Sequence, residues 1–176
     1  MGNWLGLFKK ENSADKNLLF NEFETLDLGI KYLDEKKHDL AIAEFNKVLK
    51  FNPRNEIAMI KLGHTYLQQK KYPESVKQFS RALEIDPKSI DSHEGLGFCY
   101  FEQGRTEEAM EKFNHVLKLN PNSEHSHYGL GICYNTKKQY GKAIEEFKRV
   151  LKINPNHKQA DDMLRAYTAG GITANL

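Results

Sequence analysis

The sequence predicts an all-α solenoid, in which helix–turn–helix hairpins stack side by side and a single helix closes the C-terminal end. The first observation is a repeat, because four residue types return with one spacing of 34 residues. They are the prolines Pro53, Pro87, Pro121 and Pro155, the glycines Gly29, Gly63, Gly97 and Gly131, the tyrosines Tyr32, Tyr66, Tyr100 and Tyr134, and the phenylalanines Phe45, Phe79, Phe113 and Phe147. The second observation is that apolar residues follow helical spacing twice within each repeat. Self-similarity with a period of this length is typical of solenoids.

The first half of each repeat is predicted to be a helix that packs closely on its partner. In residues 90–123, Leu96, Gly97 and Tyr100 lie at positions i, i+1 and i+4, on one side of a helix. A glycine in that row leaves no side chain between two facing helices. We therefore expect Gly97 to let the second helix of the hairpin approach closely.

The second half of the repeat is predicted to be another amphipathic helix with defined ends. Its apolar stripe is Ala109, Phe113, Val116 and Leu117. We expect Thr106 to cap the start of this helix, where Glu107 and Glu108 favour the positive end of the helix dipole. The helix should end at Asn120, because Pro121 cannot donate to the hydrogen-bond ladder. Such a hairpin cannot bury its own apolar face alone, so the repeats are expected to stack.

These repeats resemble those of the tetratricopeptide repeat (TPR) family. The eight signature positions of the family are occupied in the third unit by His93, Leu96, Gly97, Tyr100, Ala109, Phe113, Val116 and Pro121. Only the first of the eight, often Trp in the family, departs from the pattern in all four units. The resemblance implies a right-handed α-solenoid over residues 22–157, with four units at residues 22–55, 56–89, 90–123 and 124–157.

The chain continues past the fourth unit with a segment that begins like a fifth repeat and then departs from it. In residues 158–176, Met163, Leu164 and Tyr167 are placed to cover unit four, whereas Arg165 replaces the close-packing glycine. We interpret this segment as a capping helix followed by a tail.

Residues 1–21 precede the repeats as an N-terminal extension. The apolar stripe of the first repeat helix continues back into them, so we expect that helix to begin around Ala14. The segment from Trp4 to Lys10 has aromatic residues followed by lysines, a composition that suits a membrane interface. It lacks the long apolar region and the cleavage site of a secretory signal. The alternatives of a flexible arm, a self-docked arm and a membrane tether stay open.

The composition argues against several functional classes. Lys and Arg number 26 against 24 Asp and Glu, a net charge of +2, whereas nucleic acid as the main partner would favour a concentrated basic face. No run of about 20 apolar residues exists, so no segment is expected to span a membrane. Cys99 and Cys133 are one repeat apart, beyond the reach of a disulfide, which favours two buried, reduced thiols and a cytoplasmic location.

The sequence shows no catalytic, cofactor or metal motif. It has neither a glycine-rich phosphate loop nor a nucleophile motif. Of the seven histidines, His125 and His127 are two residues apart, which places them on different faces of a helix. We therefore expect no enzyme activity, no cofactor and no metal site.

The resemblance also implies where a partner binds. In the family, the second, fifth, ninth and twelfth residues of each unit line the inner curve of the solenoid. They are Phe23, Leu26, Ile30 and Leu33 in unit one, Ile57, Ile60, His64 and Leu67 in unit two, Asp91, Glu94, Phe98 and Phe101 in unit three, and His125, Tyr128, Ile132 and Asn135 in unit four. Most are apolar or aromatic, and an apolar strip on a protein surface usually marks a contact site. We expect this groove to bind a peptide or amphipathic helix of another protein, with Phe98 and Phe101 as anchors.

Several alternatives stay open for this groove. Part of the strip can pack against neighbouring helices or be covered by residues 1–21. Another copy of the chain can fill it, which would make the protein a self-assembling subunit rather than an adaptor. Asp91 and Glu94 would favour a basic residue on the ligand. The identity of that partner does not follow from the sequence.

Overall fold

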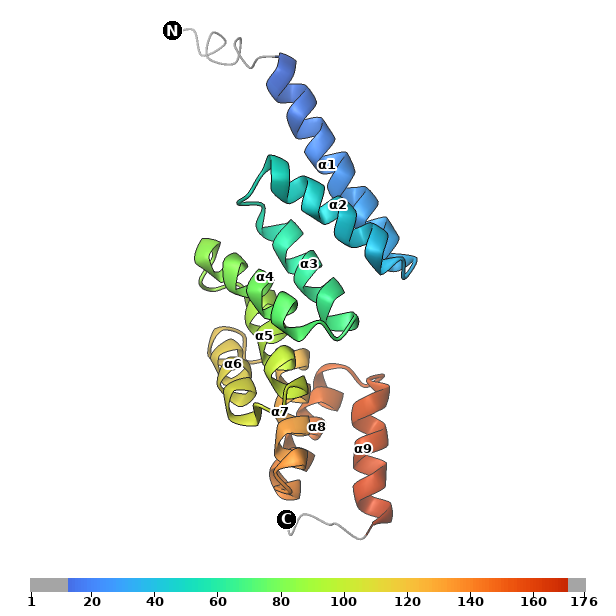
Figure 1. The fold of residues 1–176 in the computed structure, drawn as a ribbon. Helices are drawn as coiled ribbons and strands as arrows, with labels where there is room; N and C mark the ends of the chain where they lie inside the picture. Colours follow the sequence, from blue (N-terminus) through green and yellow to red (C-terminus); the bar gives the residue numbers. More distant parts are fainter. Residues whose placement is uncertain (1–12, 171–176) are drawn as a thin grey trace, which may run out of the picture.

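Nine α-helices and no strand make up the described part of the chain in this computed structural model, which comprises the backbone of residues 13–170 and the side chains of residues 21–170 (Figure 1). The helices are α1 (Ser13–Asp34), α2 (His38–Phe51), α3 (Glu56–Gln68), α4 (Tyr72–Ile85), α5 (Ile90–Glu102), α6 (Thr106–Leu119), α7 (Glu124–Thr136), α8 (Tyr140–Ile153) and α9 (Lys158–Ala169). Consecutive helices pack against each other, and α1, α3, α5 and α7 also contact one another in sequence. The prediction of an α-solenoid of helical hairpins is confirmed.

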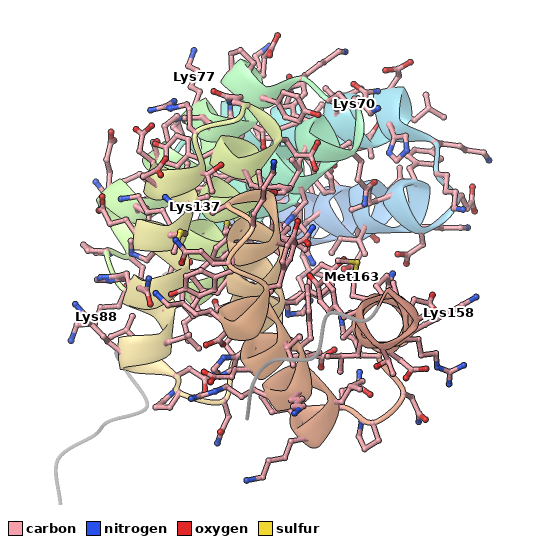
Figure 2. The ribbon with its side chains drawn as sticks, turned by 90° about the horizontal axis from the view of Figure 1, so that it is seen from below. Lys70, Lys77, Lys88, Lys137, Lys158 and Met163 are labelled. Carbon is pink, nitrogen blue, oxygen red and sulfur yellow. The ribbon has the colours of Figure 1, made fainter. Side chains whose placement is uncertain are left out.

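The helix that follows the fourth hairpin covers one end of the solenoid. Figure 1 shows α1 and α9 at opposite ends of an elongated stack. Ala160 and Tyr167 of α9 are buried against the fourth hairpin, with Met163 and Leu164 partly buried beside them. In Figure 2, Met163 lies on the side of α9 that faces the stack, and Lys158 points away from it. The packing therefore agrees with the capping role expected of this segment.

The opposite end of the solenoid begins with a longer helix. α1 starts at Ser13, within one residue of the expected position, and has 22 residues against 13 in α3, α5 and α7. The segment from Trp4 to Lys10 and residues 171–176 lie outside the described residues, so the expectations for them stay predictions. None of the helices between residues 13 and 170 is long and apolar enough to cross a membrane.

One phenylalanine in the second helix of each hairpin fills the space between hairpins. Phe45, Phe79, Phe113 and Phe147 are fully buried. A Cβ atom placed on Gly97 would lie 2.6 Å from Cε1 of Phe113, and one on Gly129 of the next hairpin would lie 2.5 Å from Cζ of the same ring. The Phe113 ring is thus enclosed by glycines of two successive hairpins. The close approach expected at Gly97 is confirmed, and Phe113 is the side chain that makes it.

The second helices end as expected but do not start as expected. Asn120 follows α6 with an extended backbone (φ −133°), in keeping with the proline after it. Thr106, however, is already the first residue of α6, and no side chain caps this helix. The capping role predicted for Thr106 is wrong. A capping side chain stands one residue before the helix, where the chain has Arg105, and Thr106 is buried instead.

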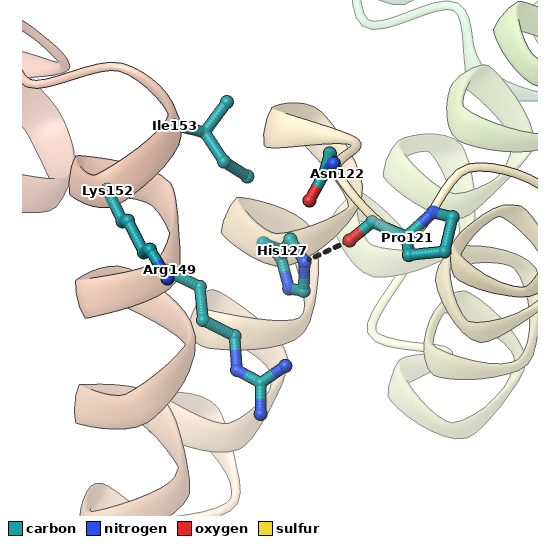
Figure 3. Close-up of a pocket in the computed structure, with 6 residues that line it drawn as sticks. All are labelled: Pro121, Asn122, His127, Arg149, Lys152 and Ile153. Atoms are coloured by element: carbon teal, nitrogen blue, oxygen red, sulfur yellow. Dashed lines mark hydrogen bonds between the residues drawn. The ribbon is translucent and has the colours of Figure 1, made fainter.

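Histidines of the first helices hold the turns between hairpins. The Nε2 atom of His93 lies 3.1 Å from the carbonyl oxygen of Pro87. The Nε2 atom of His127 lies 2.9 Å from the carbonyl oxygen of Pro121, the contact drawn in Figure 3. This second contact borders a hollow of about 410 Å³ between the turn and the end of α8. Each hydrogen bond ties a proline turn to the helix that follows it.

The two cysteines are buried and free. The Cys99 thiol donates to the Ser75 hydroxyl at 3.1 Å. Burial raises the pKa of the thiol to about 11 in Cys99 and to about 12 in Cys133. Both thiols are therefore protonated and poorly nucleophilic near neutral pH, as structural cysteines are. The prediction of two buried thiols is confirmed.

Candidate functional site

We call the inner face the set of sixteen residues that were predicted to line the groove. The structure places four of them on each of α1, α3, α5 and α7. Within each helix they are spaced three, four and three residues apart, which puts them on one side of that helix. Because these helices contact one another in order, the four groups make one continuous face across the hairpins.

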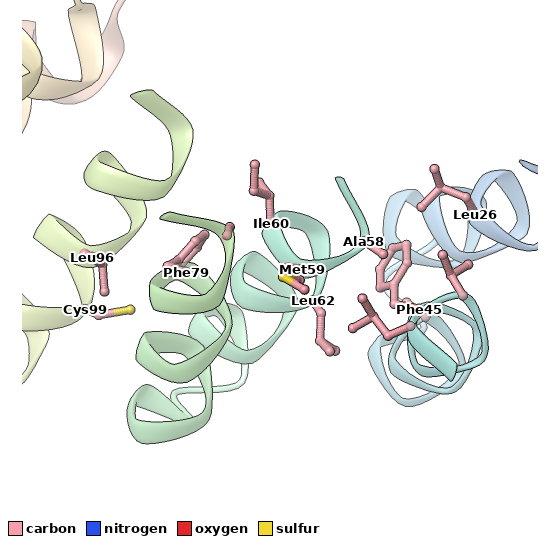
Figure 4. Close-up of a cluster of buried hydrophobic side chains, with 13 residues drawn as sticks. Leu26, Phe45, Ala58, Met59, Ile60, Leu62, Phe79, Leu96 and Cys99 are labelled. Atoms are coloured by element: carbon pink, nitrogen blue, oxygen red, sulfur yellow. The ribbon is translucent and has the colours of Figure 1, made fainter. Parts of the chain in front are cut away.

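The members of the inner face differ in exposure. Leu26, Ile60 and Glu94 are buried. Phe23, Ile57, Asp91 and His125 are exposed, and the other nine are partly exposed, namely Ile30, Leu33, His64, Leu67, Phe98, Phe101, Tyr128, Ile132 and Asn135. Leu26 and Ile60 belong to the hydrophobic cluster shown in Figure 4. Part of the predicted strip thus serves the core, and the partly exposed and exposed residues remain accessible to a ligand.

The exposed apolar surface of the inner face lies on the first two hairpins. Phe23 is 65% exposed and Ile57 is 53% exposed, at the same position of α1 and α3. The equivalent residues of α5 and α7 are the polar Asp91 and His125. The inner face is therefore apolar at the N-terminal end and mixed at the C-terminal end.

A hollow of about 280 Å³ lies at one edge of the inner face, between the end of α3 and α5. Its lining residues are Leu67, Gln68, Lys70, Tyr72, Phe98 and Glu102. Leu67 and Phe98 supply its apolar part, and the Tyr72 hydroxyl donates to the Glu102 carboxylate at 3.2 Å. The sequence predicted only Leu67 and Phe98. Gln68 and Glu102 directly follow the last inner-face residue of their units, so that adjacency was the available signal.

The two predicted anchors are held by the core. The Phe98 ring packs edge-on against Phe113, with 5.0 Å between the ring centroids. Phe98 and Phe101 are both partly buried against the cluster that contains Ala109 and Phe113. Each therefore offers part of a fixed ring to a ligand, and a fixed ring loses little side-chain entropy on binding.

Glu94 contacts the next hairpin within the chain. Its buried carboxylate accepts a hydrogen bond from the Ser126 hydroxyl at 2.8 Å and another from the Ser123 hydroxyl. Both serines lie at the start of α7, where a negative charge is favourable. Of the two acidic residues expected to attract a basic ligand, Asp91 is the exposed one.

The histidines of the inner face offer little for metal binding. His64 packs edge-on against Phe79 at 4.9 Å, and burial lowers the pKa of its ring, so the ring is neutral at pH 7. The Nδ1 atom of His125 lies 3.9 Å from the Glu94 carboxylate. Among the residues that the structure describes, no three His, Cys, Asp or Glu side chains are grouped in a way that suits a metal ion.

Stacked helical hairpins define a class, the helical-repeat solenoids. Three family models place the chain within this class: two described as tetratricopeptide repeat match residues 27–55 and 100–167, and one described as TPR repeat matches residues 63–104. The chain belongs to the tetratricopeptide repeat family. Members of this family are generally scaffolds for protein–protein interaction, and this chain has the fold of such a scaffold. No curated protein matches the sequence significantly.

Solved structures show the same fold. A crystal structure of MamA is 26% identical with a TM-score of 0.68, over 82% of this chain and 85% of that chain. TTC0263, a thermophilic TPR protein of Thermus thermophilus, is 20% identical with a TM-score of 0.76, over 85% and 83% of the two chains. PilF of Pseudomonas aeruginosa is 21% identical with a TM-score of 0.75, over 84% and 68%. The last two are similar in fold alone.

Proposed function

We propose that this protein is a non-catalytic adaptor that binds a peptide or an amphipathic helix of another protein along the inner face. The observation that carries the proposal is the accessible apolar surface of that face together with the hollow beside Leu67 and Phe98. The hollow is the best place for one apolar side chain of the ligand, because Leu67 and Phe98 line it and the Phe98 ring is held against Phe113. The exposed Asp91, about two helical turns from Phe98 on α5, favours a basic residue elsewhere on the ligand.

The expected affinity is moderate. Each fully buried apolar anchor contributes roughly 1.5–3 kcal/mol before the ordering of the ligand is subtracted. Phe98 and Phe101 are already partly buried, so each contributes less than a fully exposed ring would. A net binding free energy on the order of −8 kcal/mol, or a micromolar Kd, suits a reversible adaptor.

The outer side of α1 supports an adaptor over an end-to-end assembly of copies. Glu24, Asp27 and Lys31 are exposed there. The residues at the positions of Glu24 and Lys31 in the later hairpins are small and completely buried: Ala58, Ser92, Ser126, Thr65, Cys99 and Cys133. Another hairpin stacked on α1 in the same way would bury the charged groups of Glu24 and Lys31, which is strongly unfavourable without partners. Continuation of the solenoid through a second copy is therefore disfavoured at this end.

A display library of random peptides, selected on the immobilised protein, tests the proposal. We expect a shared apolar motif to be enriched and its binding to be lost in the double variant Leu67→Ser, Phe98→Ser. The matched control is Leu119→Ser, Ile153→Ser, because these exposed apolar residues lie at the ends of α6 and α8, away from the inner face. Circular dichroism establishes that both variants are folded. Peptides that bind the first variant as well as the unaltered protein would move the site off the inner face.

A further inference from the structure

The described residues of the repeats leave the apolar end of the inner face uncovered. Phe23 and Ile57 occupy the same position on two neighbouring helices, so about one helix-packing distance of 8–10 Å separates their backbones. Both side chains are more than half exposed, at 65% and 53%. The repeat does not require apolar residues at this position, because α5 and α7 carry Asp91 and His125 there. Something other than the fold must account for the pair.

The pair continues into an apolar platform. Leu26 and Ile60 lie one turn further along the same two helices and are buried, and Ile30 follows on α1 as a partly exposed residue. A flat segment with several aromatic or aliphatic side chains would extend this core outward and remove Phe23 and Ile57 from water. We call the exposed pair with these three residues the N-terminal platform.

We infer that residues 1–12 of this same chain occupy the N-terminal platform, with the apolar cluster of Trp4, Leu5, Leu7 and Phe8 laid over Phe23 and Ile57. The cluster places four apolar residues within five positions, and it is joined to the helix that carries Phe23. This inference concerns the free protein. The platform is the N-terminal part of the inner face, and the hollow beside Leu67 and Phe98 that is proposed for the partner lies outside it.

The length of the chain allows the contact. Phe23 is ten residues into α1, which is about 15 Å from its start at Ser13. Twelve residues in extended form span up to about 40 Å, so the segment can reverse direction before Ser13 and return along α1 beyond Phe23. A tether this short holds the cluster at an effective concentration of about millimolar, which makes even a weak contact substantially occupied. A second copy of the chain or a lipid surface lacks that advantage.

The test uses the fluorescence of Trp4, which is the only tryptophan of the chain and therefore reports on this segment alone. In the full-length protein we expect the Trp4 emission to be blue-shifted relative to the variant Phe23→Ser, Ile57→Ser. The acrylamide quenching constant should be about twofold lower than in that variant, because the segment occupies the platform at least half of the time. The control variant Leu119→Ser, Ile153→Ser should keep the shielding of the unaltered protein.

A second measurement keeps the folded body unaltered. The methyl resonances of Ile57 should show ring-current shifts from the segment, and these should disappear in the variant Trp4→Ser, Phe8→Ser. An emission spectrum and a quenching constant that are the same in the unaltered protein and in the Phe23→Ser, Ile57→Ser variant would overturn the inference. Shielding that grows with protein concentration would assign the platform to a second copy instead. Shielding that appears only with anionic phospholipid vesicles would assign the segment to a membrane.

Discussion

The third and fourth hairpins differ in how they hold one histidine at the same position. Both carry nearly the same stretch in the first helix, GLGFCY and GLGICY, and both use the same backbone hydrogen bonds in the turn that follows. In the fourth hairpin, Nδ1 of His127 lies 2.6 Å from the Glu146 carboxylate. In the third hairpin, Lys112 stands at the position of Glu146, and the buried Nδ1 of His93 has no hydrogen-bond partner within the described residues.

The difference sets the hydrogen bonding of the two histidines. Each ring nitrogen of His127 lies within hydrogen-bond distance of an oxygen, Nδ1 of the Glu146 carboxylate and Nε2 of the Pro121 carbonyl, whereas among the described residues His93 has such a partner only at Nε2. Burial lowers the pKa of His93, the Pro87 carbonyl opposes this, and the nearby His115 and Lys112 lower the pKa further. The shared repeat thus places a histidine at each site, and one residue of the second helix decides whether its Nδ1 atom has a hydrogen-bond partner.

The third and fourth hairpins share the close packing of a glycine on a phenylalanine. Mutation of this glycine should lower the stability equally in both hairpins, and this should be the largest of the expected effects. Gly97→Leu and Gly131→Leu should each lower the free energy of unfolding by at least about 1–3 kcal/mol, since a Cβ alone would lie 2.6 Å from Phe113 and 2.5 Å from Phe147. Urea unfolding measures the loss. The control is Gly141→Ala, where a Cβ meets nothing within 4 Å. An unchanged midpoint in either leucine variant would show that the close packing is not what joins the helices.

The next largest loss of stability should come from giving the His127 site of the fourth hairpin the lysine that the His93 site of the third hairpin has. Glu146→Lys removes the carboxylate that contacts Nδ1 of His127 and leaves this buried atom without its partner, so we expect a loss of about 1–3 kcal/mol. The neighbouring Glu145 is exposed, and Glu145→Lys should change the stability little. Equal stability of the two variants would mean that the His127–Glu146 pair contributes nothing to the fold.

The reverse change should stabilise the third site by a smaller amount. Lys112→Glu supplies an acceptor for Nδ1 of His93 when the ring is protonated, because Nε2 already donates to the Pro87 carbonyl, and the expected gain of about 0.5–1.5 kcal/mol should be largest at acidic pH. Lys112 also contacts the Glu111 carboxylate at 3.3 Å, but that pair lies at the surface and is worth little. Lys118→Glu, at an exposed position of the same helix, is the matched control for the change of charge.

The variant Lys112→Glu should also alter the pH dependence of the free energy of unfolding. The folded protein holds His93 with a lowered pKa, so below about pH 6.5 the unfolded chain binds more protons and the stability falls as the pH falls. His64 contributes in the same direction, because burial lowers its pKa too. With glutamate at position 112 the folded state can also keep the proton of His93. The loss of stability between about pH 7.5 and about pH 5.5 should then be smaller than in the unaltered protein, and an equal loss would contradict this account.

The smallest effect concerns the turns inside the two hairpins. The turn of the third hairpin has Gly104 at φ +76°, and the turn of the fourth has Lys138 at φ +58°, a conformation that favours glycine. Lys138→Gly should stabilise the protein by about 0.5–1 kcal/mol, because the relief of strain exceeds the greater freedom of glycine in the unfolded chain. Gly104→Lys should destabilise it by a similar amount. Thermal melts of both variants that shift in the same direction would contradict the strain at Lys138.

The repeat sequence was sufficient to predict the fold and much of the packing. Helical spacing determines which side of each helix is apolar, and Pro121 determines where α6 stops, because both effects are local. The 34-residue period then requires every hairpin to pack on the next in the same way. The capping segment was also predictable, since Arg165 stands where a close-packing glycine would be needed to continue the array.

The tertiary structure decided which side chains meet. Contacts such as that of Glu94 with Ser126, Tyr72 with Glu102, or His127 with Glu146 join residues 19 to 32 positions apart, and they depend on how far two helices turn and approach each other. Sequence spacing specifies a helical face only to within a broad arc, so it could not separate the buried Leu26 and Ile60 from the accessible Leu67 and Phe98. The sequence by itself determined a stack of hairpins and the residues of the inner face, and only the packing of neighbouring hairpins decided which of those residues are buried and which are exposed.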